Sequence, residues 1–105
     1  MNPLEIFITY MSWGDGGKNR PVIVFILGDD AVDVCPITTK YESKSEAVQT
    51  QYFKINDWEQ AGLDMLSYID TGTLISLSIT AFKNKVPIGK LTEDDKLRLR
   101  EFLCS

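Results

Sequence analysis

Short runs of β-branched and aromatic residues alternate with stretches that contain glycine, asparagine and aspartate along most of the chain. This pattern is typical of antiparallel strands joined by turns. It predicts strands at residues 4–10, 22–27, 31–37, 50–55, 65–69, 73–77 and 86–88. Residues 22–27 are apolar at every position, so we expect this strand in the middle of the sheet. Residues 11–19 contain three glycines, and we expect a mobile loop there.

A short helix is expected between two of these strands. Asn56 is a favourable N-cap for residues 56–61, and Gly62 would end the helix. Residues 41–48 are mainly charged and polar, which predicts an irregular surface connection.

The clearest helix lies near the end of the chain. Thr92 and Asp95 have the spacing of a capping box, with aspartate in place of the usual glutamate, so a helix is predicted over residues 92–103. We expect one face of this helix to pack on the sheet and its basic residues to face solvent. The packing face consists of Leu99, Phe102 and Leu103, and the basic residues are Lys96, Arg98 and Arg100. The fold class is therefore mainly β (α+β), a small curved barrel or half-open antiparallel sheet with helical additions.

The hairpin of residues 22–27 and 31–37 brings two polar residues together. Because the two strands run antiparallel around a short turn, residues near 21 and near 38 face one another. Pro21 fixes its own φ and favours an extended Arg20, so this arginine would start the strand on a rigid base. A planar guanidinium held in this way suits phosphate binding, and Thr38 adds a hydroxyl. The alternative is a solvated arginine at the end of a strand.

Composition limits the function. The 105 residues fit one domain, residues 1–105, and no stretch could span a bilayer, so we expect a cytoplasmic protein. The chain has no histidine, and its two cysteines, Cys35 and Cys104, lack metal-ligand spacing and are expected to be free thiols. With 11 basic and 15 acidic residues, a net charge of −4 argues against a broad nucleic-acid-binding face.

Four separated blocks carry a resemblance to a known family. They are GKNRPVIV at residues 17–24, PITT at 36–39, NDWEQAGL at 56–63 and IGKLTEDD at 88–95. Their order and spacing resemble the PemK/MazF toxins of toxin–antitoxin systems. The resemblance covers nearly the whole chain.

The resemblance implies a compact SH3-like barrel that forms a homodimer and cleaves single-stranded mRNA at short sequences. It also implies that the enzyme needs no metal or other cofactor and leaves a 2′,3′-cyclic phosphate and a 5′-hydroxyl. A cognate antitoxin protein would hold it inactive. A second hypothesis from another class is an SH3-like protein-interaction module without catalysis, since fold does not settle function.

The family pattern places the catalytic residues at Arg20 and Thr38, the two residues that the hairpin geometry brings together. Arg20 would stabilise the charge that builds on the phosphoryl oxygens, and Thr38 would orient the phosphate or pass a proton. Further RNA contacts are expected from Trp13, Lys18, Asn19, Thr39, Lys40 and Ser67. Trp13 has a second interpretation as an aromatic cover of the core. Ser67 stands where many MazF toxins have a glutamine.

Overall fold

The structure is a computed structural model that describes residues 1–104, with Trp13 described by its backbone alone. Strands dominate the chain, as the sequence predicts. The elements in order are β1 Glu5–Trp13, β2 Gly16–Leu27, β3 Ala31–Thr38, α1 Glu46–Gln49, β4 Tyr52–Lys54, β5 Tyr68–Asp70, β6 Ile75–Ser78, the 3-10 helix η1 Ile79–Phe82, β7 Gly89–Lys90 and α2 Glu93–Cys104.

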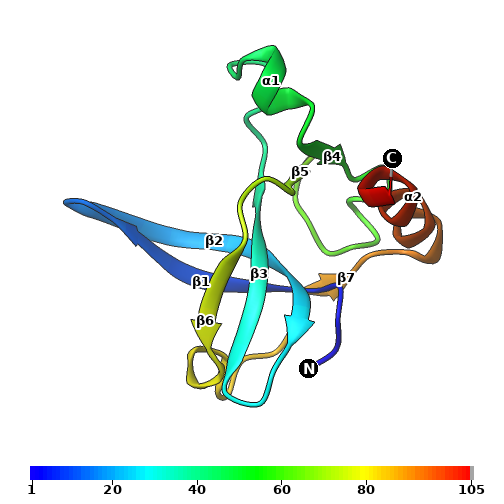
Figure 1. Cartoon of the computed structure of the whole chain (residues 1–105). Coiled ribbons are helices and arrows are strands. Elements are labelled where there is room, and N and C mark those ends of the chain that lie inside the picture. Colours follow the sequence, from blue (N-terminus) through cyan, green and yellow to red (C-terminus); the bar gives the residue numbers. More distant parts are fainter. Residues whose placement is uncertain (105) are drawn as a thin grey trace.

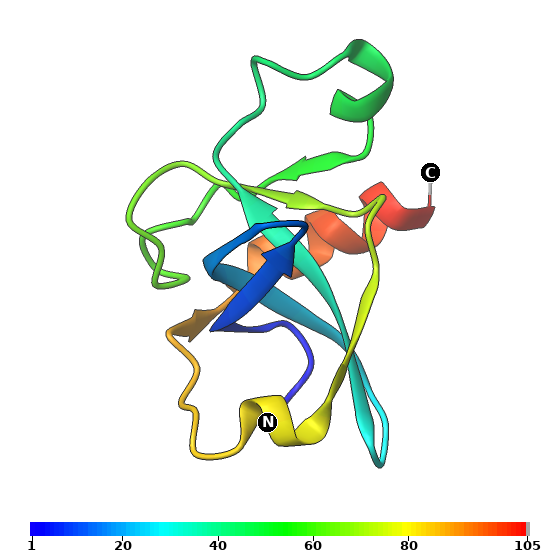
Figure 2. The same ribbon diagram turned by 90° about the vertical axis from the view of Figure 1, so that its left-hand side faces the viewer.

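The strands form a curved antiparallel sheet with the order β4-β5-β3-β2-β1-β7, and β6 pairs with the other half of β3. The β1–β2 hairpin projects to one side of the molecule, and α2 lies on the other side, next to β4 (Figure 1). The helix η1 lies at the opposite end from α1 (Figure 2). This half-open barrel of antiparallel strands with a C-terminal helix confirms the predicted fold class.

The middle of β2 is buried on both faces, which explains its uninterrupted apolar run. Ile23 packs into one core cluster, together with residues of α2 and of the segment around β4. Val22 and Val24 point the other way, into a second cluster that contains Phe7 and Phe82. All three β2 residues are fully buried. The strand therefore lies between two cores, as expected for a central strand.

The prediction of a mobile loop at residues 11–19 is wrong. Strands β1 and β2 continue through it as a regular hairpin, in which Trp13 pairs with Gly16 and only Gly14 and Asp15 form the turn. Gly14 has φ +44°, a value that glycine adopts without strain. Arg20 therefore lies inside β2 and is paired with Thr9 of β1, not at the start of a strand.

The predicted helix at 56–61 is also wrong, and the segment forms successive turns. One hydrogen bond of the α-helical type is present, from Ala61 N–H to the Asp57 carbonyl at 3.0 Å, and the next N–H, of Gly62, donates to Glu59 instead. Gly62 does end the segment, with φ +90° and its Cα close to the Ile88 carbonyl. The connection predicted at 41–48 instead includes α1, whose first turn is capped by the Ser45 side chain.

The other boundary changes are smaller. The strands expected at 50–55, 65–69 and 73–77 are shorter or displaced as β4, β5 and β6, and the edge strand expected at 86–88 is β7, slightly later in the chain. Helix α2 agrees with its prediction, although Leu103 is 51% exposed and does not join the packed face. None of the helices in residues 1–104 is long and apolar enough to cross a membrane.

A buried carboxylate joins α2 to the turns before it. Asp95 accepts hydrogen bonds from the backbone N–H groups of Asn56, at 3.3 Å, and Asp57, at 2.8 Å. Its Oδ1 also lies 2.6 Å from the Arg98 guanidinium, which stacks 4.8 Å from the Phe53 ring centre. Arg98 is therefore partly packed, contrary to the expectation of a solvated side chain. The Thr92 hydroxyl accepts from the Asp95 N–H at 3.3 Å, so half of the expected capping box is present.

Candidate active site

A cavity of about 170 Å³ lies between β2 and the end of β3. Its walls contain seven of the eight site residues predicted from the sequence. The lining residues are Lys18, Asn19, Arg20, Pro21, Ile37, Thr38, Thr39, Lys40 and Ser67. The side chain of Trp13, the eighth, lies outside the described part of the chain. The functional roles of all eight residues remain predictions.

The β2–β3 register positions the two candidate catalytic residues. Val22 pairs with Pro36, and the same register continued by two residues places Arg20 opposite Thr38. Both residues line the cavity and are half-buried. The geometric expectation that the hairpin brings them together therefore holds, even though Arg20 lies deeper in its strand than expected.

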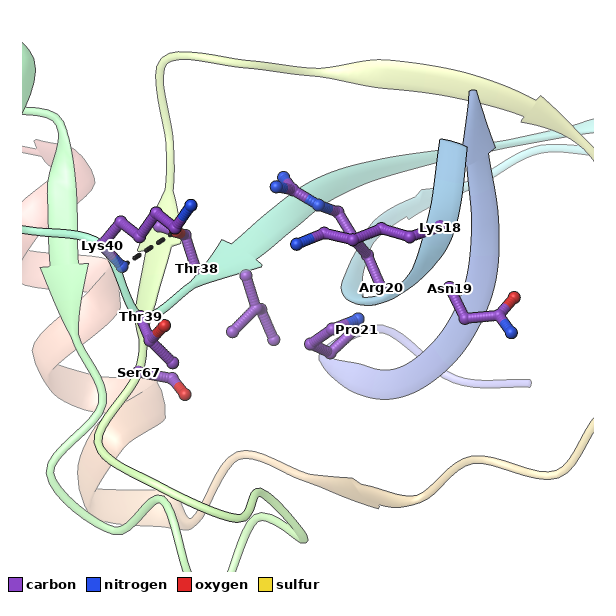
Figure 3. A pocket seen from close by; sticks show the side chains of 9 residues that line it. Lys18, Asn19, Arg20, Pro21, Thr38, Thr39, Lys40 and Ser67 are labelled. Carbon is purple, nitrogen blue, oxygen red and sulfur yellow. Dashed lines mark hydrogen bonds between the residues drawn. The ribbon is translucent and has the colours of Figure 1, made fainter. Parts of the chain in front are cut away.

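Three cationic side chains converge on this cavity. Lys18 and Arg20 are two residues apart in β2, so they project from the same face of the strand. Lys40 approaches from the segment after β3, and its side chain lies across the cavity from theirs (Figure 3). The nine described lining residues include no carboxylate. The cavity is thus locally positive in a chain whose net charge is −4.

The Thr38 hydroxyl is held by the backbone. Its Oγ1 accepts a hydrogen bond from the Lys40 N–H at 3.1 Å. Because a threonine hydroxyl is both an acceptor and a donor, this contact fixes the oxygen while the O–H can donate to a phosphate oxygen in the cavity. The same contact holds the start of the segment that carries Lys40.

Asn19 and Ser67 line the cavity, but their polar groups are less available to RNA than the sequence suggests. The Asn19 side chain points away from Arg20 (Figure 3). Ser67 is only 3% exposed, and its hydroxyl donates to the Met65 carbonyl at 2.8 Å. Ser67 therefore stabilises the bend before β5. The Asn19 amide points away from Arg20 (Figure 3), so it offers few hydrogen bonds to a ligand at that residue.

Three tyrosines next to Thr38 were not predicted. Thr38 pairs with Tyr68 in the β3–β5 ladder. Tyr68 stacks on Tyr41, with ring centres 4.5 Å apart, and Tyr52 is tilted against both. Each tyrosine is visible as an aromatic in the sequence, but their meeting depends on the pairing of β3 with β5. No local pattern gives that long-range pairing.

Burial and nearby charges shift the pKa values of two of these tyrosines, and one of those charges is Arg20 of the cavity. Burial raises the pKa of Tyr52, the Asp70 carboxylate raises it further, and the Arg20 guanidinium partly offsets both. The pKa of Tyr68 is also raised, mainly by burial and then by Glu42 and Tyr41. Both phenols therefore stay protonated at neutral pH and are hydrogen-bond donors there. Burial raises the pKa of the Cys35 thiol to about 12, so this free cysteine is unreactive.

A second, more apolar hollow of about 220 Å³ adjoins the cationic cavity. Pro21, Thr39 and Ser67 line both. The remaining walls of the hollow are Ile8, Gly62, Leu63, Asp64, Met65 and Ile88. The sequence blocks at 56–63 and 88–95 meet here because the Gly62 turn passes close to the Ile88 carbonyl.

The fold around this cavity is similar to that of a known protein. No protein-family model matches the chain, and no curated protein sequence matches it. Among solved structures, it is similar to the Mycobacterium tuberculosis toxin MazF-mt6, with a TM-score of 0.70 and 19% sequence identity. The similarity covers 94% of this chain and 91% of that toxin. The chain has the fold of a MazF toxin. The expected likeness to the MazF toxins is thus confirmed for the fold, over nearly the whole length of both chains.

Proposed function

We propose that this protein is the toxin of a toxin–antitoxin pair, an endoribonuclease that cleaves single-stranded mRNA without a metal ion. The observation that carries the proposal is the cation-lined cavity that Arg20 and Thr38 both line, from the neighbouring strands β2 and β3. The MazF fold around this cavity supports the same function. We further propose that residues 1–105 act as one domain, as a homodimer, in the cytoplasm.

The cleavage is an attack of the ribose 2′-oxygen on the adjacent phosphorus. The new P–O2′ bond closes the 2′,3′-cyclic phosphate while the P–O5′ bond breaks. The 2′-hydroxyl loses its proton, and the departing O5′ gains one to become the 5′-hydroxyl. Negative charge builds on the non-bridging oxygens during the attack, so cations and donors that contact them there lower the barrier.

The residues of the cavity can be assigned roles in this step. Arg20 offers two parallel N–H groups to the phosphoryl oxygens, and the Thr38 hydroxyl donates a third hydrogen bond. Lys18 and Lys40 attract the flanking phosphates. The phenol of Tyr52, whose pKa is raised mainly by burial and lowered in part by Arg20, stays protonated and is not a base. The chain has no histidine, so proton transfer has to use other groups.

Inhibition is proposed to use the same cavity. An extended acidic segment of the antitoxin would occupy the groove around Arg20 and Thr38 and exclude RNA by mass action. Apolar anchors on the neighbouring barrel wall would add binding energy that salt weakens little. Titrating the antitoxin against RNA cleavage at two salt concentrations tests this competition.

The decisive experiment incubates the purified protein with a long RNA in EDTA and maps the new 5′ ends. We expect cuts at a short sequence, 5′-hydroxyl ends and no loss of activity on chelation. Binding of RNA or protein without any cut would instead favour the non-catalytic interaction module.

A further inference from the structure

Charge is divided between the two adjoining hollows. Lys18, Arg20 and Lys40 stand on one side of the shared wall, and Asp64 lines the other. Asp64 is the one charged residue among the nine described residues that line the second hollow. It is exposed, and within residues 1–104 no hydrogen bond or ion pair engages its carboxylate.

A nucleotide has the same division of charge. Its phosphate is anionic, and its base has two apolar faces and an edge that carries hydrogen-bond donors. The second hollow has apolar walls from Ile8, Leu63 and Ile88 and a carboxylate, which is the usual make-up of a small-molecule site. We propose that this hollow binds the base next to the scissile phosphate and that Asp64 selects guanine there. The inference rests on the proposed function, because the phosphate bound at Arg20 fixes where the base lies.

The choice of guanine follows from the two acceptor oxygens of a carboxylate. The Watson–Crick edge of guanine presents two adjacent donors, N1–H and the 2-amino group, which a carboxylate accepts in a bidentate manner. Adenine and cytosine each present one amino group beside an acceptor nitrogen. Uracil presents one N–H between two carbonyl oxygens, and a carboxylate repels both. Single-stranded RNA leaves this edge free for reading.

The hydroxyl of Ser67 does not compete with Asp64 for the base. The Ser67 hydroxyl already donates to the Met65 carbonyl, and Ser67 is buried. Asp64 therefore supplies the negative charge of the hollow and the two acceptor oxygens that would pair with guanine. It also repels phosphate, so its removal strengthens the binding of bases that make no paired hydrogen bonds to it, whereas guanine loses those bonds and the preference among bases falls.

The test measures binding by fluorescence anisotropy with pentanucleotides of the form UUXUU, where X is guanine, inosine, adenine, cytosine or uracil. A 2′-deoxyribose at every position prevents cleavage. We expect the wild-type protein to bind the guanine probe about tenfold more tightly than the uracil probe, as a charged hydrogen bond would give. Inosine lacks the 2-amino group and should fall between them. In Asp64→Asn the guanine preference should fall below about threefold.

The matched control is Glu59→Gln, which removes one exposed negative charge from outside both hollows. It should strengthen the binding of all five probes and leave the guanine preference at the wild-type ratio. An unchanged ratio in Asp64→Asn would overturn the inference. So would a change in sedimentation of Asp64→Asn without a change in ratio, since the hollow would then be a contact between copies of the chain.

Failure of the proposed function is separable from failure of this inference. If Arg20→Ala does not weaken binding of any probe, the phosphate site is wrong, and the base site fails with it. If Arg20→Ala weakens all five probes while Asp64→Asn keeps the wild-type base preference, only the guanine site is wrong.

Discussion

The salt dependence of RNA binding gives a direct count of the phosphate contacts. Three cations, Lys18, Arg20 and Lys40, line the cavity. For single strands, the logarithm of the binding constant falls by about 0.7 per phosphate contact for each tenfold rise in salt. Three contacts predict a slope of about −2.1, so affinity should fall about 20-fold between 50 and 200 mM salt.

Removing one cation should change this slope by a known amount. Lys40→Gln leaves two contacts, a slope of about −1.4 and a loss of only about sevenfold over the same salt range. Lys40 is exposed and its backbone N–H, not its side chain, holds Thr38, so the variant should fold normally. Lys83→Gln is the matched control, since Lys83 is exposed and lies outside the cavity; it should keep the wild-type slope.

The assay is fluorescence anisotropy with the all-deoxy pentanucleotide UUGUU at four salt concentrations. A wild-type slope of about −2.8, which corresponds to contacts with all four phosphates of the probe, would mean that cations outside this cavity also bind the strand. Equal slopes for Lys40→Gln and the wild type would remove Lys40 from the phosphate contacts.

Three further changes test the site and the fold. Arg20→Ala should lower cleavage by about 10²- to 10³-fold with an unchanged melting temperature, and Arg20→Lys should recover little because it loses the two-point contact; wild-type cleavage by Arg20→Ala would refute the role. Thr38→Ser should stay within about tenfold of the wild type, whereas the near-isosteric Thr38→Val should lose more, and equal rates on one defined RNA would exclude the hydroxyl. Asp95→Ala leaves two backbone N–H groups and the Arg98 guanidinium without their acceptor, so urea unfolding should show that the free energy of unfolding falls by about 2–4 kcal/mol. Glu93→Gln, which breaks an exposed pair with Lys96, should cost under about 1 kcal/mol, and similar losses for the two variants would contradict the buried role of Asp95.

The features that could be predicted from the sequence are those set by neighbours along the chain. Residues 22–27 form a central strand because every side chain there is apolar, and α2 begins where Thr92 supplies an N-cap. The loop prediction at residues 11–19 is wrong because glycine is common both in flexible loops and in tight turns. Gly14 closes a tight two-residue turn between two long strands, although the same composition is typical of a flexible loop.

The segment 56–61 shows a different limit. Its composition favours a helix, but Asp95, from about forty residues further on, accepts the N–H groups of Asn56 and Asp57. A tertiary carboxylate thus replaces the local cap, and Gly62 turns the chain against Ile88 after a single hydrogen bond of the α-helical type. Propensity is a weak prior when tertiary contacts of this kind are present.

The same distinction explains which parts of the candidate site the sequence predicts. Arg20 and Thr38 lie on one hairpin, so the antiparallel geometry alone brings them together, even with an error in where β2 begins. The tyrosine cluster needs β5 to pair with β3, and the hollow with Asp64 needs the Gly62 turn to meet Ile88. Both are long-range contacts. The residues proposed to act on phosphate are therefore those that local geometry places, whereas the residues proposed to read the base depend on how the whole chain closes around β2 and β3.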